Sequence, residues 1–204
     1  MLFRIPLGHT FFLRGPFALR EKTSNLQQEE NQARSLGALL KTKSLLIAII
    51  TAATAQLAMV MIMTITPHHM HHHHHNLPSI SWVLTVHLFG MFGFSFLSGW
   101  LADRLGRLNT IGLGGLVLIA SCILALLSES FPVLLTALYL LGLGWSFCFL
   151  SATAMLVDGL SARERGRVQG FNEAIVSLSS GIGSLSSGLI FDSLGFNNKS
   201  HITQ

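Results

Sequence analysis

The chain has 204 residues, of which 50% are hydrophobic and only 11% are charged. Soluble domains carry about 25% charged residues, and a soluble fold this apolar would expose large hydrophobic patches, which are rare, so the composition excludes an ordinary soluble enzyme. The formal net charge of +4 comes from basic residues that lie mostly beside apolar segments, a pattern that indicates membrane orientation and not nucleic-acid binding.

Residues 1–43 form a polar to mixed N-terminal segment. Its first apolar stretch is interrupted by His9 and Arg14 and is followed by no small-residue cleavage site, so it does not have the pattern of a signal peptide. Residues 21–35 are rich in Glu, Gln and Asn, which predicts a flexible linker. Residues 34–43 suit a short amphipathic lead-in helix.

Five long apolar segments follow, and their only charged residues are Glu173 and Asp192, near the two ends of the fifth. About 20 apolar residues in a helix cross a bilayer core of roughly 30 Å, and lipid forces each backbone to bond within its own segment. Pro67 and Pro78 are expected to end and start helices at the first turn. We predict an all-α integral membrane protein whose domain at 44–195 has five transmembrane helices, at 45–65, 80–101, 110–128, 132–157 and 171–194.

The basic residues predict the orientation of these spans. If the N-terminal segment is cytoplasmic and the spans alternate, twelve Lys and Arg residues lie on the cytoplasmic side and only Lys199 lies on the other. Such an imbalance is the positive-inside signal. The expected location is a plasma membrane of the bacterial inner-membrane type, with the tail 196–204 outside.

The most specific motif is Gly99-Trp-Leu-Ala-Asp103-Arg104-Leu-Gly106-Arg107, at the predicted cytoplasmic join of the second and third spans. It resembles the signature loop of the major facilitator superfamily of transporters, in which this loop latches the cytoplasmic side. Gly99 permits a close helix approach, Gly106 permits a tight turn, and the arginines can pair with Asp103 or with acids on other helices. Leu108 departs from the family, where a further basic residue is common. The alternative is an ordinary basic turn.

Three further stretches follow the order of the C-terminal half of such a transporter, spans seven to eleven: Met61–Pro67, His87–Phe92 and Arg167–Glu173. The resemblance implies a partial bundle, truncated relative to a complete transporter, that lacks an N-terminal six-helix half. In the family, the substrate lies between two six-helix bundles.

A few polar residues inside the spans are candidates for proton coupling or substrate contact. His87 is the only ionisable group deep within a span, and such groups are functional hypotheses by default; the alternative is a neutral imidazole bonded to a neighbouring helix. Gln56 and Trp145 are weaker candidates for a substrate cavity. Asn172 and Glu173, together with Arg167, are expected to make contacts between helices on the cytoplasmic side, with a coupling role as the alternative.

Small residues and histidines form two further patterns. Gly181, Ser184 and Gly188 fall along one face of the fifth span and predict close helix packing, with lining of a water-filled path as the alternative. A histidine run beside the first external turn could capture a metal weakly, although a tolerated low-complexity turn is the simpler interpretation. The run comprises His68, His69, His71, His72, His73, His74 and His75.

The sequence predicts a transporter and not an enzyme, because it carries no phosphate loop, nucleophile elbow or zinc-protease motif. With two cysteines a disulfide framework is excluded, and no cofactor is expected. We expect a partial facilitator-type secondary transporter that moves a small-molecule substrate by alternating access, with proton coupling as an option. The expected partners are the lipid bilayer, the substrate and the missing half, with no nucleic acid. Two alternatives remain: a non-transporting half that associates with another transporter, and His-assisted metal transport.

Overall fold

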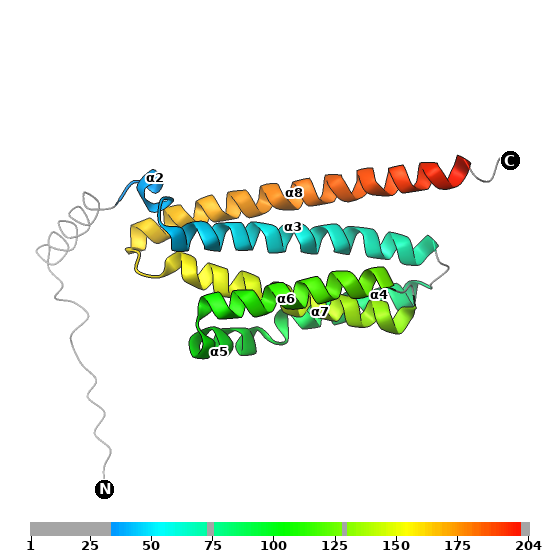
Figure 1. Ribbon diagram of the computed structural model, residues 1–204, viewed down its shortest axis with the longest axis horizontal. Helices are drawn as coiled ribbons and strands as arrows, with labels where there is room; N and C mark the ends of the chain where they lie inside the picture. The colour runs from blue at the N-terminus through cyan, green and yellow to red at the C-terminus, as the bar shows by residue number, and fades with distance from the viewer. Residues whose placement is uncertain (1–33, 73–75, 128–129, 201–204) are drawn as a thin grey trace, which may run out of the picture.

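The structure is a computed structural model that describes residues 34–72, 76–127 and 130–200, and these residues fold entirely into helices and short connections (Figure 1). The predicted all-α membrane protein is thereby confirmed. Most of the N-terminal segment, His73 to His75 and the last four residues of the tail lie outside the described residues. The helices are α2 (Leu36–Leu39), α3 (Lys43–His72), α4 (Leu77–Phe92), α5 (Ser95–Leu105), α6 (Arg107–Leu127), α7 (Phe131–Val157) and α8 (Ala162–Ser200).

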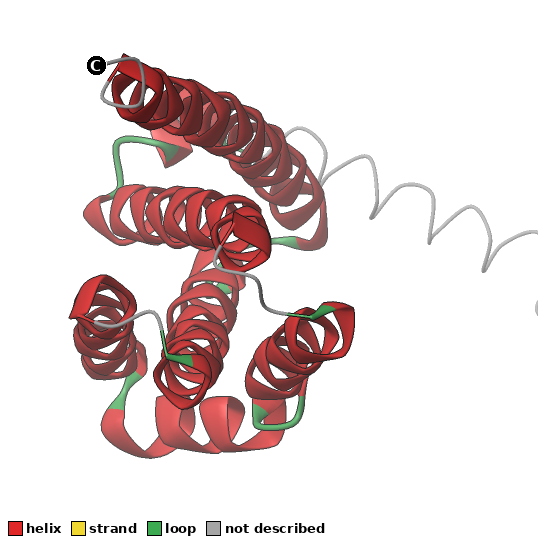
Figure 2. Cartoon of the chain, turned by 90° about the vertical axis from the view of Figure 1, so that its right-hand side faces the viewer, coloured by secondary structure: helices red, strands yellow, loops and turns green. Residues whose placement is uncertain are grey.

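Helix α7 is the centre of the bundle. It packs along α6, α4 and α3, whereas α8 packs mainly along α3, and Figure 2 shows α7 surrounded by these neighbours with α8 at the outer edge. Burial agrees with this central position. Half of the most apolar part of α7 is buried inside the bundle, compared with 22% to 28% for the other three candidate spans. The many exposed Leu, Ile and Phe side chains of the outer helices suit contact with lipid.

Four stretches of the described chain are long and apolar enough to cross a membrane: Lys43–His71, Leu77–Leu105, Arg107–Leu127 and Phe131–Val157. The fifth predicted span lies within α8, which is helical throughout it. Its side chains from residue 190 onward lie outside the described residues, to which the four stretches are limited. Helix α8 also extends beyond the predicted span at both ends, and it includes the first residues of the predicted tail.

The structure corrects three helix boundaries. The predicted span 80–101 is not one helix: α4 ends at Phe92 and α5 begins at Ser95, and Figure 2 shows α5 lying across the edge of the bundle between α4 and α6. Pro67 does not end the first span, because α3 continues through it to His72; membrane helices tolerate proline when neighbouring groups compensate for the lost bond. The lead-in helix is only the single turn of α2. Pro78 does lie at the start of α4, as expected.

The two ends of the bundle differ in charge. The starts of α3, α6 and α8 and the ends of α5 and α7 lie at one end (Figure 1), which we call the basic end because it carries Lys43, Arg104, Arg107, Arg163, Arg165 and Arg167. The end of α3, with its histidines, lies at the opposite end, which we call the histidine end. This arrangement agrees with alternate spans that reverse direction.

Candidate functional site

The predicted signature loop is a tight turn between α5 and α6. Gly106 joins the two helices with a φ of +85°, a left-handed conformation that a residue with a Cβ atom rarely adopts. The guanidinium of Arg104 lies 4.9 Å from the ring centroid of Trp100, one turn earlier, in a cation–π contact. Asp103 is exposed, and no hydrogen bond or ion pair is found for it within the described residues. No other part of the described chain comes within 4 Å of a Cβ placed on Gly99, so the expected close approach is not made inside this chain.

Arg107 ties the start of α6 to the end of α7. Its Nη1 donates to the backbone oxygen of Ala154 at 2.8 Å, and the same nitrogen forms an ion pair with Asp158, the residue after α7. The oxygen of Ala154 is one of the last four carbonyls of α7, which have no partner within the helix, and a cation is favoured at this negative end of the helix dipole. The expected acid on another helix is therefore Asp158, which the sequence did not single out.

His87 is fully buried between α4 and α7. Its Nδ1 lies 3.0 Å from the backbone oxygen of Leu138, and because a carbonyl can only accept, Nδ1 carries the hydrogen. Its Nε2 has no partner among the described residues. A Cβ on Gly142 would collide with the backbone oxygen of His87, and a Cβ on Gly90 would lie 2.6 Å from the oxygen of Tyr139. Glycines thus let the two backbones approach, and the His87 ring is bonded to a neighbouring helix. Its neutrality and its role in coupling stay predictions.

Gln56 joins three helices through its side-chain amide. The indole Nε1 of Trp145 on α7 donates to its Oε1 at 3.0 Å, and its Nε2 donates to the hydroxyl of Ser180 on α8 at 3.0 Å. Trp145 also stacks on Phe149, with ring centroids 4.5 Å apart. We call Gln56, Trp145 and Ser180 the polar junction. The sequence named Gln56 and Trp145 separately; the structure brings them into direct contact and adds Ser180.

The face of α8 that packs against α3 differs from the predicted one. Ser180, Gly183 and Ser187 follow helical spacing along this inner face, and a Cβ on Gly183 would lie 3.1 Å from the backbone oxygen of Leu57. The predicted packing residues are exposed. Ser184 is exposed, and no described atom lies within 4 Å of a Cβ placed on Gly181 or Gly188.

Asn172 and Glu173 point in different directions from neighbouring positions on α8. Asn172 is 1% exposed, and its Oδ1 has no partner among the described residues. Glu173 is exposed. Arg167, which was expected to act with them, instead donates to the backbone oxygen of Arg34 at 3.3 Å. The structure therefore does not join these three residues into one site.

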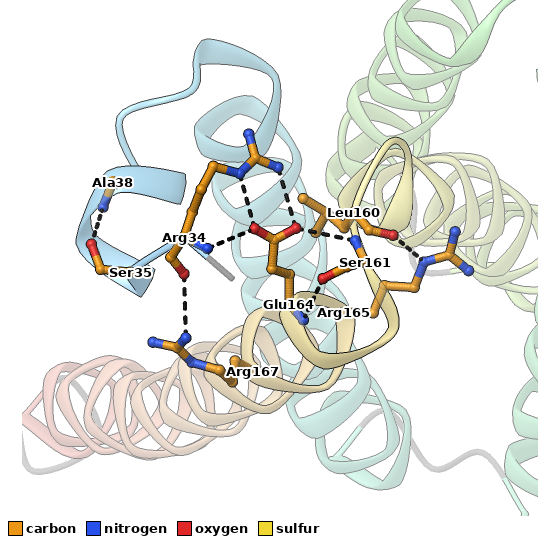
Figure 3. A network of polar contacts seen from close by, with 8 residues as sticks. All are labelled: Arg34, Ser35, Ala38, Leu160, Ser161, Glu164, Arg165 and Arg167. Carbon is orange, nitrogen blue, oxygen red and sulfur yellow. Dashed lines mark hydrogen bonds and ion pairs between the residues drawn. The ribbon is translucent and has the colours of Figure 1, made fainter. Parts of the chain in front are cut away.

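Glu164, which the sequence analysis missed, is the centre of a polar network at the start of α8 (Figure 3). Its Oε1 accepts from Nε of Arg34 at 2.9 Å and from the backbone N–H of Arg34 at 3.0 Å. Its Oε2 accepts from Nη2 of Arg34 at 3.3 Å and from the backbone N–H of Ser161 at 3.1 Å. These donors, above all the Arg34 side chain, lower the pKa of Glu164 to about 2. The Ser161-x-x-Glu164 spacing is a capping box. The sequence pattern therefore predicts the contacts between Ser161 and Glu164, but not those with Arg34.

The histidine run is only partly described. His68, His69, His71 and His72 belong to the last turns of α3, while the other three lie outside the described residues. Within residues 34–72, 76–127 and 130–200, no three His, Cys, Asp or Glu side chains are grouped as metal ligands. Metal capture by the complete run stays a prediction.

Comparison with known proteins gives one consistent result. The family model described as Major Facilitator Superfamily matches residues 45–198. An uncharacterised MFS-type transporter of Bacillus subtilis, YddS, is 32% identical over 186 residues, which are 88% of this chain and 43% of that protein. A second from the same organism, YdeG, is 39% identical over 117 residues, or 56% of this chain and 27% of that protein. The riboflavin transporter RfnT of Brucella anthropi is 39% identical over 90 residues, or 44% of this chain and 23% of that protein.

These matches cover less than half the length of each relative. All three relatives are named as transporters and none as an enzyme, and the candidate spans make the chain a multi-pass membrane protein. The signature loop, the all-helical bundle and the family match agree. The chain belongs to the major facilitator superfamily.

Proposed function

We propose that the chain forms part of a secondary transporter that moves a small solute by alternating access, with the polar junction as its contribution to the solute path. The junction carries this proposal. It places an amide, an indole and a hydroxyl from three helices at one point of the bundle. In the family, the solute binds between two bundles near the membrane midplane, and α3, α7 and α8 supply these groups from one bundle.

The amide of Gln56 is not saturated by its two partners in the junction. A glutamine amide has two N–H donors and two acceptor lone pairs, and the junction uses one N–H and one lone pair. A solute amide or a heterocyclic ring edge can bond to the remaining pair. The stacked rings of Trp145 and Phe149 add an aromatic surface beside it.

The proposed setting follows from charge and from the length of the relatives. The basic end faces the cytoplasm of a plasma membrane, in accordance with the positive-inside rule, which also places the N-terminus inside. The lipid bilayer surrounds the outer helices. A six-helix partner half supplies the other wall of the solute path, since the relative YddS is more than twice as long as the region that this chain matches.

Solute uptake by proteoliposomes tests the proposal. The chain is reconstituted alone and together with a separately expressed six-helix half, and riboflavin is the first solute because RfnT is named for it. Uptake is expected only with both halves. Gln56→Ala should lower it at least about fivefold, because a missing partner for a bound polar group costs about 1 kcal/mol or more. Thr136→Ala is the control, since this exposed side chain bonds only to Pro132 of its own helix.

A panel of solutes distinguishes the wrong choice of solute from a wrong assignment of the polar junction to the solute path. A panel of neutral heterocycles and amides is tested in the same vesicles, so that failure of riboflavin alone does not decide the matter. If some solute is taken up equally by wild type and Gln56→Ala, the junction is not part of the path.

In the same vesicles, His87→Ala tests proton coupling: uptake with unchanged dependence on a pH gradient would remove that role.

A second candidate function is association with another transporter half without transport. The exposed face of α8 favours it, because Gly181 and Ser184 present small residues that allow another helix to approach closely. Gly181→Leu should then abolish co-purification of the chain with a six-helix half, while Gly112→Leu, at an equally open position on α6, should not. Equal capture of both variants would exclude this face as the contact.

A further inference from the structure

The segment before the first span is held on the start of α8 by contacts that the proposed solute path does not use. Figure 3 shows Arg34 lying over Glu164, with its backbone N–H and the Nε and Nη2 atoms of its guanidinium turned toward the carboxylate. Arg167 donates to the backbone oxygen of Arg34 in return. Arg34 is thus fixed through both its main chain and its side chain, across a separation of 130 residues.

An apolar contact continues this docking. Ser35 caps α2 by accepting from the N–H of Ala38 at 3.3 Å, and the turn of α2 directs Leu39 inward. Leu39 is 1% exposed and belongs to a cluster that includes Leu160, before α8, and Val168, on α8. Arg34, through polar contacts, and Leu39, through apolar contacts, therefore both hold this short segment against the start of α8.

The carboxylate of Glu164 shows why this segment stays seated. The Glu164 side chain is only 6% exposed, and a buried charge that loses its partner is strongly unfavourable. Three of its four donors come from Arg34. If the segment left, only the N–H of Ser161 would remain.

The opposite end of the same helix pair is less tightly closed. Near the histidine end, a cavity of about 200 Å³ separates α3 from α8 and is lined by Thr64, Ile65, His68, Ser187 and Gly188. The Gln56–Ser180 bond joins the two helices between this cavity and the docked segment.

We propose that residues 34–39 are a strap that occupies a docking surface on the start of α8, formed by Leu160, Ser161, Glu164, Arg167 and Val168. The strap holds the basic ends of α3 and α8 together, so that the two helices separate from the histidine end. The strap does not depend on solute transport, and transport could fail with the strap intact.

Hydrogen exchange on the full chain in lipid nanodiscs tests the docking. Arg34→Ala removes the side-chain anchor without touching the capping box, and amide exchange over residues 34–40 should become at least about tenfold faster as local opening increases. Ser161→Ala is the matched control. It removes the hydroxyl that caps α8 but keeps the backbone donor to Glu164, so exchange over 34–40 should stay near that of the wild type.

Charge reversal separates the ion pair from general loss of structure. Glu164→Arg alone should release the segment, and Arg34→Glu combined with Glu164→Arg should restore the ion pair and slow exchange relative to Glu164→Arg. The wild-type rate should not return, because an arginine cannot accept from the backbone N–H groups of residue 34 and Ser161. The strap is overturned if Arg34→Ala exchanges like the wild type, if Ser161→Ala releases the segment equally, or if the double variant is no better than Glu164→Arg.

Spin-label distances test which end opens. Labels at Lys41 and Ala162 report the strap end, and labels at Thr64 and Gly188 report the histidine end; all four positions are exposed. The strap-end distribution should be narrow in the wild type and broad in Arg34→Ala, while the histidine-end distribution should be broad in both. A strap-end distribution as broad as that of the histidine end in the wild type would refute the hinge.

Discussion

Replacing Gly90 by alanine tests the close packing of α4 on α7 and the position of His87. The added Cβ would lie 2.6 Å from the backbone oxygen of Tyr139, whereas ordinary contacts begin at 3.4 Å. Because the obstructing atom belongs to a helix backbone, no change of rotamer can relieve the clash. Helix α4 must therefore withdraw from α7 by about 0.8 Å, the difference between these two distances.

This withdrawal also breaks a hydrogen bond one turn away. The 3.0 Å separation of His87 Nδ1 and the oxygen of Leu138 would increase beyond hydrogen-bonding distance. Overpacking costs about 1–3 kcal/mol, and an interhelical hydrogen bond in a membrane protein averages about 0.6 kcal/mol. We expect Gly90→Ala to lower the free energy of unfolding by about 2–3 kcal/mol.

The assay is unfolding of the chain in mixed micelles by added SDS, followed by tryptophan fluorescence. Gly112→Ala is the control, because a Cβ there meets nothing within 4 Å. The ¹⁵N shifts of the His87 ring report its hydrogen bond directly and should change only in Gly90→Ala. If Gly90→Ala is as stable as Gly112→Ala and the ring shifts are unchanged, the close approach of α4 and α7 is wrong.

Three further predictions concern other contacts. Arg107→Ala should lower the free energy of unfolding by about 1 kcal/mol, because its ion pair with Asp158 is partly exposed; thermal denaturation measures this, and a loss above about 3 kcal/mol would mean a buried pair. Gln56→Ala and Ser180→Ala should be coupled by about 0.5 kcal/mol or more in a double-mutant cycle, and strict additivity would contradict their bond. The pKa of Glu164 is lowered to about 2, so its stabilising effect is complete above its ordinary pKa and is lost as pH falls toward 2. The stability difference from Glu164→Gln should accordingly be constant from pH 8 to pH 5 and shrink below pH 4.5; a decrease already between pH 7 and pH 6 would refute this pKa.

Elements visible in local sequence were predicted well. The four stretches that can span a membrane follow from uninterrupted apolar runs, since lipid leaves the helix as the way to satisfy each backbone. The turn at Gly106 and the start of α4 at Pro78 were predicted because glycine permits a positive φ, whereas proline fixes φ and removes a donor. Pro67 was misjudged since helix continuation through a proline depends on packing and not on the residue alone.

The faces of the helices could not be predicted in the same way. In a soluble helix, the polar face identifies the buried face opposite, but in lipid both faces are apolar. The small residues of α8 repeat on more than one face, so the sequence favoured Gly181 and Gly188 while the structure buries Gly183. The break between α4 and α5 likewise has no proline or charged residue to mark it.

The sequence by itself therefore determined which segments are helical, which of them can enter a membrane, and where the basic residues lie along them. These properties depend on hydrophobicity and backbone bonding within about 20 neighbouring residues. Only the tertiary structure decided that Gln56 meets Trp145 and Ser180, and that Arg34 meets Glu164. Such pairs are separated by 89 to 130 residues, and their contact depends on the rotation and depth at which each helix packs, which no local pattern records.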